Sequence, residues 1–302
     1  IRPLNMNKVQ NREELKFTFI MVIAMITWGY SWTSAKMLGP YGEVPVKLFL
    51  RFFLAAISLI PILLKYKVPF IINKKGLQYI LVNALALCSY NYFYFRSTHM
   101  GLAGAGGVLV TTLNPILTST VVFCFIERSI NLKDLLGLAI GFIGGSIIIR
   151  FWEMDINLMI QSGNIFYILA SLSWVSVTIT SQKSKDSIHF LTYSFWSFII
   201  AAAISFLFCN MSDIINTINY DLKFWTNIFV LSIIVMSFAN TMYFFASSKV
   251  GAVRASSFIF VVPLTAIIFS KIFLNEEIIL TTLIGGCLSI IAVYIINKKK
   301  IK

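Results

Sequence analysis

Long apolar segments alternate with short polar ones along the whole chain, and this pattern predicts ten membrane-spanning helices. An α-helix needs about 20 apolar residues to cross a hydrocarbon core about 30 Å thick. The expected spans are 15–37, 45–64, 77–96, 102–125, 132–149, 163–182, 189–209, 224–246, 252–274 and 278–297. The apolar runs are continuous, which disfavours a β-barrel because barrel strands alternate apolar and polar residues over about ten positions.

Composition agrees with an integral membrane protein. Of the 302 residues, 58% are hydrophobic and 12% are charged, and the mean hydropathy is +0.83. The four cysteines lie in apolar runs without a C-x-x-C pair, and the two histidines lie at segment ends, so neither a metal site nor a cofactor is expected. The sequence has no paired carboxylates or nucleophile and base pattern within its spans, so an enzyme is not expected.

Basic residues are distributed unevenly between the two ends of the expected spans. If the N-terminus is cytoplasmic, 18 of the 25 Lys and Arg residues fall on the cytoplasmic side, six fall on the other side and Arg51 lies within a span. The positive-inside rule therefore places both termini in the cytoplasm. The net charge of +13 fits attraction to anionic lipid head groups, whereas nucleic acid binding would need a clustered basic face.

The two halves of the chain share a pattern at a nearly constant offset. Matching residues 146 to 150 positions apart are Trp28 and Trp174, Asn91 and Asn240, Gly101 and Gly251, Pro115 and Pro263, Glu127 and Glu276, and Gly137 and Gly285. We therefore expect two five-span repeats, at 15–149 and 163–297. Because five is odd, the second repeat enters the membrane from the opposite side, as in many secondary transporters that alternate access to a midplane site. A duplicated scaffold without transport is the alternative.

These features resemble the drug/metabolite transporter superfamily, in particular its ten-span group built from two EamA repeats. The resemblance is carried by "TWGYSW" in the first span, "LRFFLAA" in the second, "LNPILTSTVVFCFIERS" in the fourth and "VVPLTAIIFSKIFLNEE" in the ninth. It implies an all-α integral membrane protein in which two inverted five-helix repeats surround a central cavity. It also implies transport of small metabolites or amino acids, often outward. Phe198 departs from strict repetition because it takes the second-repeat place of Arg51.

Arg51 is the basic residue that lies clearly inside an expected span. A charge at that depth costs about 3 kcal/mol or more unless it finds water or a partner. It is therefore a candidate to bind a carboxylate on the solute. The alternatives are a side chain that snorkels to the membrane surface and an ion pair with Glu43. The 12 Asp and Glu residues all lie in the tails, loops or ends of the expected spans, which disfavours proton-coupled export of lipophilic cations by an embedded carboxylate.

Aromatic and amide side chains complete the candidate solute site. Trp28 and Trp32 share a helix face at i and i+4, and Trp28 lies deeper than an interfacial aromatic belt. The alternatives are core packing for Trp28 and outer-leaflet anchoring for Trp32. An amide cannot satisfy all its donors and acceptors within one helix, which favours the asparagines over serine and threonine. The candidate solute-binding residues are Arg51, Trp28, Trp32, Tyr90, Asn91, Asn114, Trp174 and Asn240.

Together these observations predict a secondary transporter of the plasma membrane, the inner membrane in a bacterium, that works by alternating access as a monomer. Its expected partners are the lipid bilayer and a small solute that bears a carboxylate or an aromatic group. Export is favoured over the alternatives of import or exchange. A non-transporting scaffold or receptor is the alternative from another class.

Overall fold

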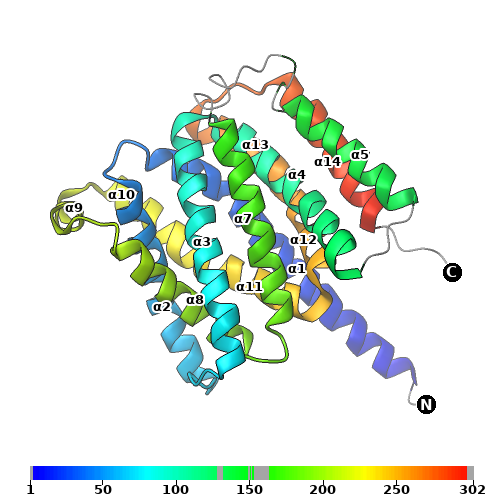
Figure 1. Cartoon of the computed structure of the whole chain (residues 1–302), viewed down its shortest axis with the longest axis horizontal. Helices are drawn as coiled ribbons and strands as arrows, with labels where there is room; N and C mark the ends of the chain where they lie inside the picture. The colour runs from blue at the N-terminus through cyan, green and yellow to red at the C-terminus, as the bar shows by residue number, and fades with distance from the viewer. Residues whose placement is uncertain (1–2, 128–131, 149, 151, 153–162, 298–302) are drawn as a thin grey trace.

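The computed structural model describes residues 3–127, 132–148, 150, 152 and 163–297, and within them it contains helices and no strand (Figure 1). The α-helices are α1 (Pro3–Met37), α2 (Val44–Lys65), α3 (Lys74–Met100), α4 (Ala103–Val121), α5 (Leu132–Ile148), α7 (Asn164–Lys183), α8 (Phe190–Phe206), α9 (Met211–Asn216), α10 (Leu222–Phe229), α11 (Thr241–Val250), α12 (Ala252–Ser256), α13 (Val262–Leu274) and α14 (Leu280–Asn297). Short π or 3₁₀ turns are η1 (Val122–Glu127), η3 (Thr217–Asn219), η4 (Val230–Asn240) and η5 (Ser257–Val261). The prediction of an all-α fold is confirmed.

Five helical segments of the described chain are long and apolar enough to cross a membrane. They are Glu14–Met37, Val44–Lys65, Ala103–Phe125, Asn164–Lys183 and Leu222–Val250. Phe190–Phe206 and Met211–Asn219 qualify together as a sixth, although they meet at a bend of 113°. Leu135–Ile148, Val262–Leu274 and Leu280–Ala292 are apolar but shorter. The chain is therefore a multi-pass helical membrane protein, while five or six of the ten expected spans meet the criteria of length and hydropathy.

The third expected span, in α3, is a helix of 27 residues that lacks a sufficiently apolar window. Its buried face carries polar side chains, among them Asn83, Asn91 and Thr98. Such groups are stable at membrane depth only when neighbouring helices or water satisfy them. The polarity of α3 therefore reflects burial inside the bundle rather than a short span.

Helix packing is matched between the two halves of the chain. Each of α2, α4 and α5 packs on its counterpart in the second half, which is α8, α13 and α14 respectively. Other contacts also correspond between the halves. Helix α3 packs on α7 as η4 packs on α1, and α1 packs on α13 as α7 packs on α4. Figure 1 shows α5 and α14 side by side at one edge of the bundle.

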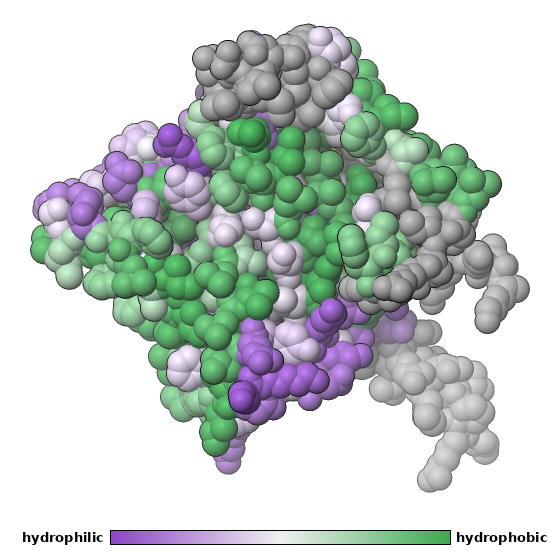
Figure 2. Space-filling model, viewed as in Figure 1, coloured by the Kyte–Doolittle hydropathy of each residue, from purple (hydrophilic) through white to green (hydrophobic). Residues whose placement is uncertain are grey.

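The surface separates into polar ends and an apolar middle. Figure 2 shows hydrophobic residues over most of the described surface on one face, with polar residues gathered in two patches on opposite sides. At the α3–α4 end, Tyr41 donates a hydrogen bond to Asp221 at 2.7 Å. At the α7–α8 end, Asn73 donates one to the carbonyl oxygen of Ser187 at 2.8 Å. The connections that close each end thus join distant parts of the chain.

Glycine allows the closest helix approach near the first aromatic cluster. A Cβ atom placed on Gly29 would lie 2.6 Å from Thr265 Cβ and 3.0 Å from the backbone nitrogen of Ala266. The second contact is with backbone, so side-chain movement cannot relieve it. Gly29 therefore lets α1 lie directly against α13, which fixes the depth and direction of the neighbouring tryptophans.

Candidate functional site

A cavity lies at the centre of the bundle, between helices of both halves. It is lined by Trp28, Ser31 and Trp32 of α1, Arg51 of α2, Tyr90 and Tyr94 of α3, Thr111 and Asn114 of α4, Trp174 of α7, and Val235 and Asn240 of η4. Its volume is about 20 Å³. This is room for about one water molecule. The expected central cavity is therefore present in a closed form that is too small for a metabolite.

Seven of the eight candidate residues line this one cavity. Asn91 does not. Its amide nitrogen donates to the carbonyl oxygen of Leu87 at 2.8 Å, and its amide oxygen is buried without a hydrogen-bond partner. Asn91 follows Tyr90 directly, and the rotation of about 100° between successive helical residues turns its side chain back onto the carbonyl oxygen of Leu87 instead of into the cavity. Asn91 therefore does not line the cavity in this closed form.

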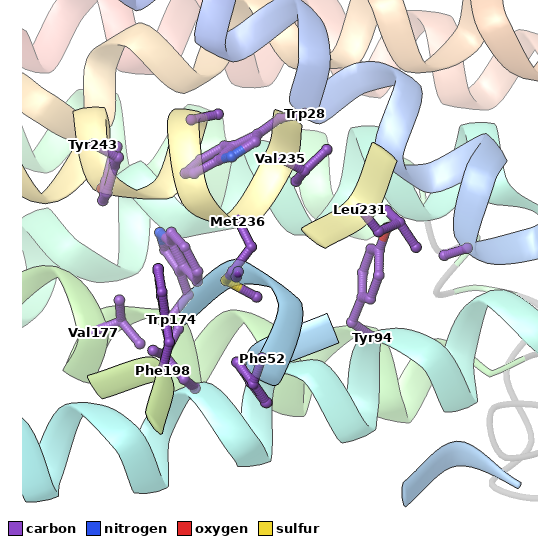
Figure 3. Close-up of a cluster of buried hydrophobic side chains, with 14 of the residues drawn as sticks. Trp28, Phe52, Tyr94, Trp174, Val177, Phe198, Leu231, Val235, Met236 and Tyr243 are labelled. Carbon is purple, nitrogen blue, oxygen red and sulfur yellow. The ribbon is translucent and has the colours of Figure 1, made fainter. Parts of the chain in front are cut away.

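Aromatic rings form most of the cavity wall. Trp174 packs edge-on against Trp28 at a centroid distance of 5.1 Å and lies 4.6 Å from Tyr90. Trp32 packs edge-on against Tyr94 at 4.7 Å. Trp32 is only 1% exposed, so it does not anchor the protein at the membrane surface. Figure 3 shows that Trp28 and Trp174, which come from different halves of the chain, lie close together in this cluster.

Several polar atoms of the cavity residues have partners, and others have none. The indole nitrogen of Trp28 donates to the amide oxygen of Asn240 at 2.9 Å, which joins α1 to η4. By contrast, the indole nitrogen of Trp174 and the amide oxygen of Asn114 are buried without a hydrogen-bond partner. Buried polar groups are rarely left unpaired, because each unmade bond costs about 1–3 kcal/mol. The amide oxygen of Asn114 therefore remains an acceptor for a ligand in this space.

Arg51 turns its guanidinium inward and is only 3% exposed. The group lies 5.3 Å from the ring centroid of Tyr94 and 5.8 Å from that of Phe95, in cation–π geometry. The Tyr94 hydroxyl lies within hydrogen-bonding reach of it, and donates its own proton to the carbonyl oxygen of Ser31 at 2.5 Å. The Nε and Nη1 atoms of Arg51 have no partner. The Arg51 side chain therefore does not snorkel to the membrane surface.

Glu43 does not pair with Arg51. Its side chain is exposed, and its electrostatic effect falls on Lys47 instead. Lys47 lies one turn before Arg51 on α2, is 1% exposed, and its ammonium has no hydrogen-bond partner. Lys47 does not line the cavity, so Arg51 is the cation that faces this space among the residues that the structure describes.

The family that matches the sequence is the EamA-like transporter family, over residues 15–150 and again over residues 161–298. The chain belongs to this family. Among similar proteins, the uncharacterized transporter YoaV of Bacillus subtilis (strain 168) is 22% identical over 89% of this chain and 92% of its own length. An uncharacterized transporter of Archaeoglobus fulgidus is 21% identical over 94% of this chain and 98% of its own length.

A solved crystal structure shares the fold of this EamA-like transporter. It aligns with a TM-score of 0.67 over 93% of this chain and 97% of that chain, at 14% sequence identity. Within the described residues, no group of three or more His, Cys, Asp or Glu residues could hold a metal ion.

The sequence identified most of the cavity but not all of its wall. Tyr94 lines it and contacts both Arg51 and Trp32. The signal for it was its spacing, since Tyr90 and Tyr94 are four residues apart and share a helix face. Val235 lines it as well, and nothing in the local sequence separates this valine from its apolar neighbours.

Proposed function

We propose that this EamA-like transporter is a secondary transporter that moves a small carboxylate-bearing solute by alternating access. The cavity is built from both halves of the chain, and the matched helix packing supports two inverted repeats at 15–149 and 163–297. In such an architecture, rocking of one repeat against the other opens a fixed central site to each side in turn. The small volume of the cavity fits an occluded state between two open ones.

The guanidinium of Arg51, which has no anionic partner, is the observation that carries the proposed solute class. Two of its nitrogens are buried without a hydrogen-bond partner, and a buried cation is costly unless a negative group joins it. A carboxylate matches the planar donor geometry of guanidinium with two parallel hydrogen bonds. The proposed solute therefore brings the negative charge that the cavity wall lacks.

The other cavity residues define the rest of the solute. The faces and edges of Trp28, Trp32 and Trp174 favour an apolar or aromatic group. The unpartnered amide oxygen of Asn114 would accept a hydrogen bond from a donor on the solute, such as an ammonium or hydroxyl group. A small amino acid or related metabolite satisfies all three requirements.

Topology and direction complete the proposal. Both termini lie in the cytoplasm, the protein works as a monomer in the plasma membrane, and net movement is outward. The distribution of basic residues supports this orientation by the positive-inside rule. Export rests on the resemblance to drug/metabolite transporters.

Counterflow in proteoliposomes tests the solute class. Vesicles that contain purified protein are loaded with one unlabelled compound and diluted into the same compound in labelled form, across a panel of amino acids and small carboxylates. Each carboxylate is matched with its amide, which keeps the size but removes the charge. We expect uptake of at least one carboxylate and about 30-fold weaker apparent affinity for its amide, since a lost buried charge pair costs 2 kcal/mol or more. Equal transport of carboxylates and amides would contradict the proposed binding of the solute carboxylate by Arg51. If no compound in the panel is exchanged, the result would favour the alternative of a non-transporting scaffold.

A further inference from the structure

The corner between α3 and α4, residues 97–104, is held by side chains from other parts of the chain. The Lys36 ammonium, near the end of α1, donates to the carbonyl oxygens of Gly101 at 2.7 Å and of His99 at 3.3 Å. The Tyr167 hydroxyl of α7 donates to the carbonyl oxygen of Leu102 at 2.9 Å. These bonds satisfy backbone acceptors that a turn between two helices leaves open.

Glu276, in the loop between α13 and α14, makes a further contact with this corner. Its carboxylate accepts hydrogen bonds from the backbone N–H groups of Ala103 at 2.8 Å and Gly104 at 2.9 Å. These are the first two residues of α4, whose N–H groups lack partners within the helix and carry its partial positive charge. The two bonds are charge-assisted, and they connect the second half of the chain to the first.

The held corner separates the central cavity from a second cavity at the α3–α4 end. The second cavity has a volume of about 330 Å³, and Lys36, Gly101, Leu102 and Tyr167 are among its lining residues. On the other side, the Tyr167 ring lies 6.0 Å, centroid to centroid, from Trp32, which lines the central cavity. Tyr167 and the corner therefore stand between the two spaces.

The first turns of α4 pack too closely on α13 for a solute to pass between them. A Cβ atom on Gly104 would overlap the hydroxyl of Ser270, and one on Gly107 would lie 2.5 Å from the Cβ of Ala266. Tyr167 packs on the same turns of α4, since a Cβ atom on Gly106 would overlap its ring, so widening the passage past Tyr167 requires the start of α4 to shift against α13. Such a movement stretches the bonds that Glu276 makes to the start of α4.

We propose that Glu276 is a gating residue, whose carboxylate holds the α3–α4 end shut by tying the α13–α14 loop to the first turn of α4. Release of these two bonds opens the passage between the central and second cavities. This inference rests on the proposed transport function, because a gate needs a solute pathway. Lys36 assists the closed state, since its charge attracts Glu276 while its own hydrogen bonds hold the other side of the corner.

Side-specific labelling of a single cysteine tests the gate. In the full chain, Cys88, Cys124, Cys209 and Cys287 are changed to serine, and Ser31, which lines the central cavity, is changed to cysteine. A membrane-impermeant thiol reagent is added to the face that carries the α3–α4 end, in oriented vesicles, and the labelling rate is measured. The variants are Glu276→Ala, Glu276→Gln and, as a matched control, Glu277→Ala, which removes the same charge from the exposed neighbouring residue.

We expect Glu276→Ala to raise the labelling rate about tenfold or more, which corresponds to a loss of about 1.4 kcal/mol in closure. Glu276→Gln should raise it less, because the amide oxygen still accepts a backbone hydrogen bond. Glu277→Ala should stay within about twofold of the parent, since surface charges contribute little.

Two results would refute the proposed role of Glu276 in gating. One is a labelling rate in Glu276→Ala that stays within about twofold of the rate in Glu277→Ala, which is the scale of a surface effect. The other is an equal rise from both faces, because general loosening of the bundle exposes the cavity to each side. The labelling assay does not depend on the solute, so failure here is distinguishable from failure of the counterflow experiment.

Discussion

Changing Arg51 to methionine should impair transport without lowering the stability of the protein. Methionine keeps the length and apolar stem of the side chain but removes the charge. If Arg51 binds the solute carboxylate, the variant leaves that carboxylate without a partner in a closed cavity. Loss of one member of a buried charge pair costs about 2–5 kcal/mol, which is about 30-fold to about 4,000-fold in apparent affinity.

Stability should not fall with affinity, because the guanidinium is buried without an anionic partner in the described structure. Its contacts with Tyr94 and Phe95 are each worth about 2 kcal/mol for a desolvated cation. Burial of a charge costs several kcal/mol, and replacement of buried charges by apolar side chains is often neutral or stabilising by about 1–4 kcal/mol. We therefore expect the melting temperature of Arg51→Met in detergent to equal or exceed that of the parent protein.

Lys47→Met is the matched control for this experiment. Lys47 lies one turn away on the same helix and has a buried ammonium without a hydrogen-bond partner, but it does not line the cavity. Lys47→Met should resemble Arg51→Met in thermal stability. In counterflow it should resemble the parent protein, with a half-saturation concentration within about threefold of the parent value, which corresponds to less than about 1 kcal/mol. Counterflow that survives intact in Arg51→Met would refute the reasoning. A large loss of stability in Arg51→Met with transport unchanged would show that the side chain is structural.

Three further substitutions test individual contacts through thermal unfolding in detergent. Trp28→Phe should lower stability by about 1–3 kcal/mol, because the buried amide oxygen of Asn240 loses its donor, and an unchanged melting temperature would contradict this. Gly29→Ala should cost about 1–3 kcal/mol through overlap with the α13 backbone, and neutrality would show that α1 and α13 separate easily. Asp221 accepts hydrogen bonds from a backbone N–H and from the Tyr41 hydroxyl, and these bonds lower the pKa of its carboxyl group. Its contribution to stability is therefore fully present above the unfolded pKa of about 3.9, and it is lost as the pH falls through the lower pKa of the folded state. In Tyr41→Phe the melting temperature should therefore decrease less than in the parent protein when the pH is lowered below about 4. An identical pH profile in the two proteins would show that the Tyr41–Asp221 hydrogen bond does not contribute to acid destabilisation.

The sequence predicted the membrane class, the helix positions and most of the cavity wall. It succeeded for Trp28, Trp174 and Asn240 because hydropathy gives the depth of a residue and the internal repeat places matching residues at matching depths. Both kinds of information describe position along a helix. They say little about the direction in which a side chain points around it, which is why Asn91 was assigned to the cavity together with its neighbour Tyr90.

Long-range contacts account for the other features of the structure that the sequence did not predict, which are the direction of the Arg51 side chain and the contacts of Glu276. The direction of the Arg51 side chain depends on Tyr94 and Phe95, which lie on another helix and provide faces for the cation. The bonds of Glu276 to the start of α4 span more than 170 residues of sequence. Local composition shows only an acidic loop at that point. Sequence pattern therefore identified Glu276 as a repeated residue without showing what it holds.

The central claim is that one cavity between the two halves opens to each face of the membrane in turn. The cysteine introduced at Ser31, in the protein without other cysteines, measures this directly when the impermeant reagent is added from each face in separate experiments. The account predicts labelling from both faces, with both rates lowered by a saturating transported carboxylate, because the occupied cavity shields the thiol. Labelling from one face alone, or from neither, under every solute condition would contradict it.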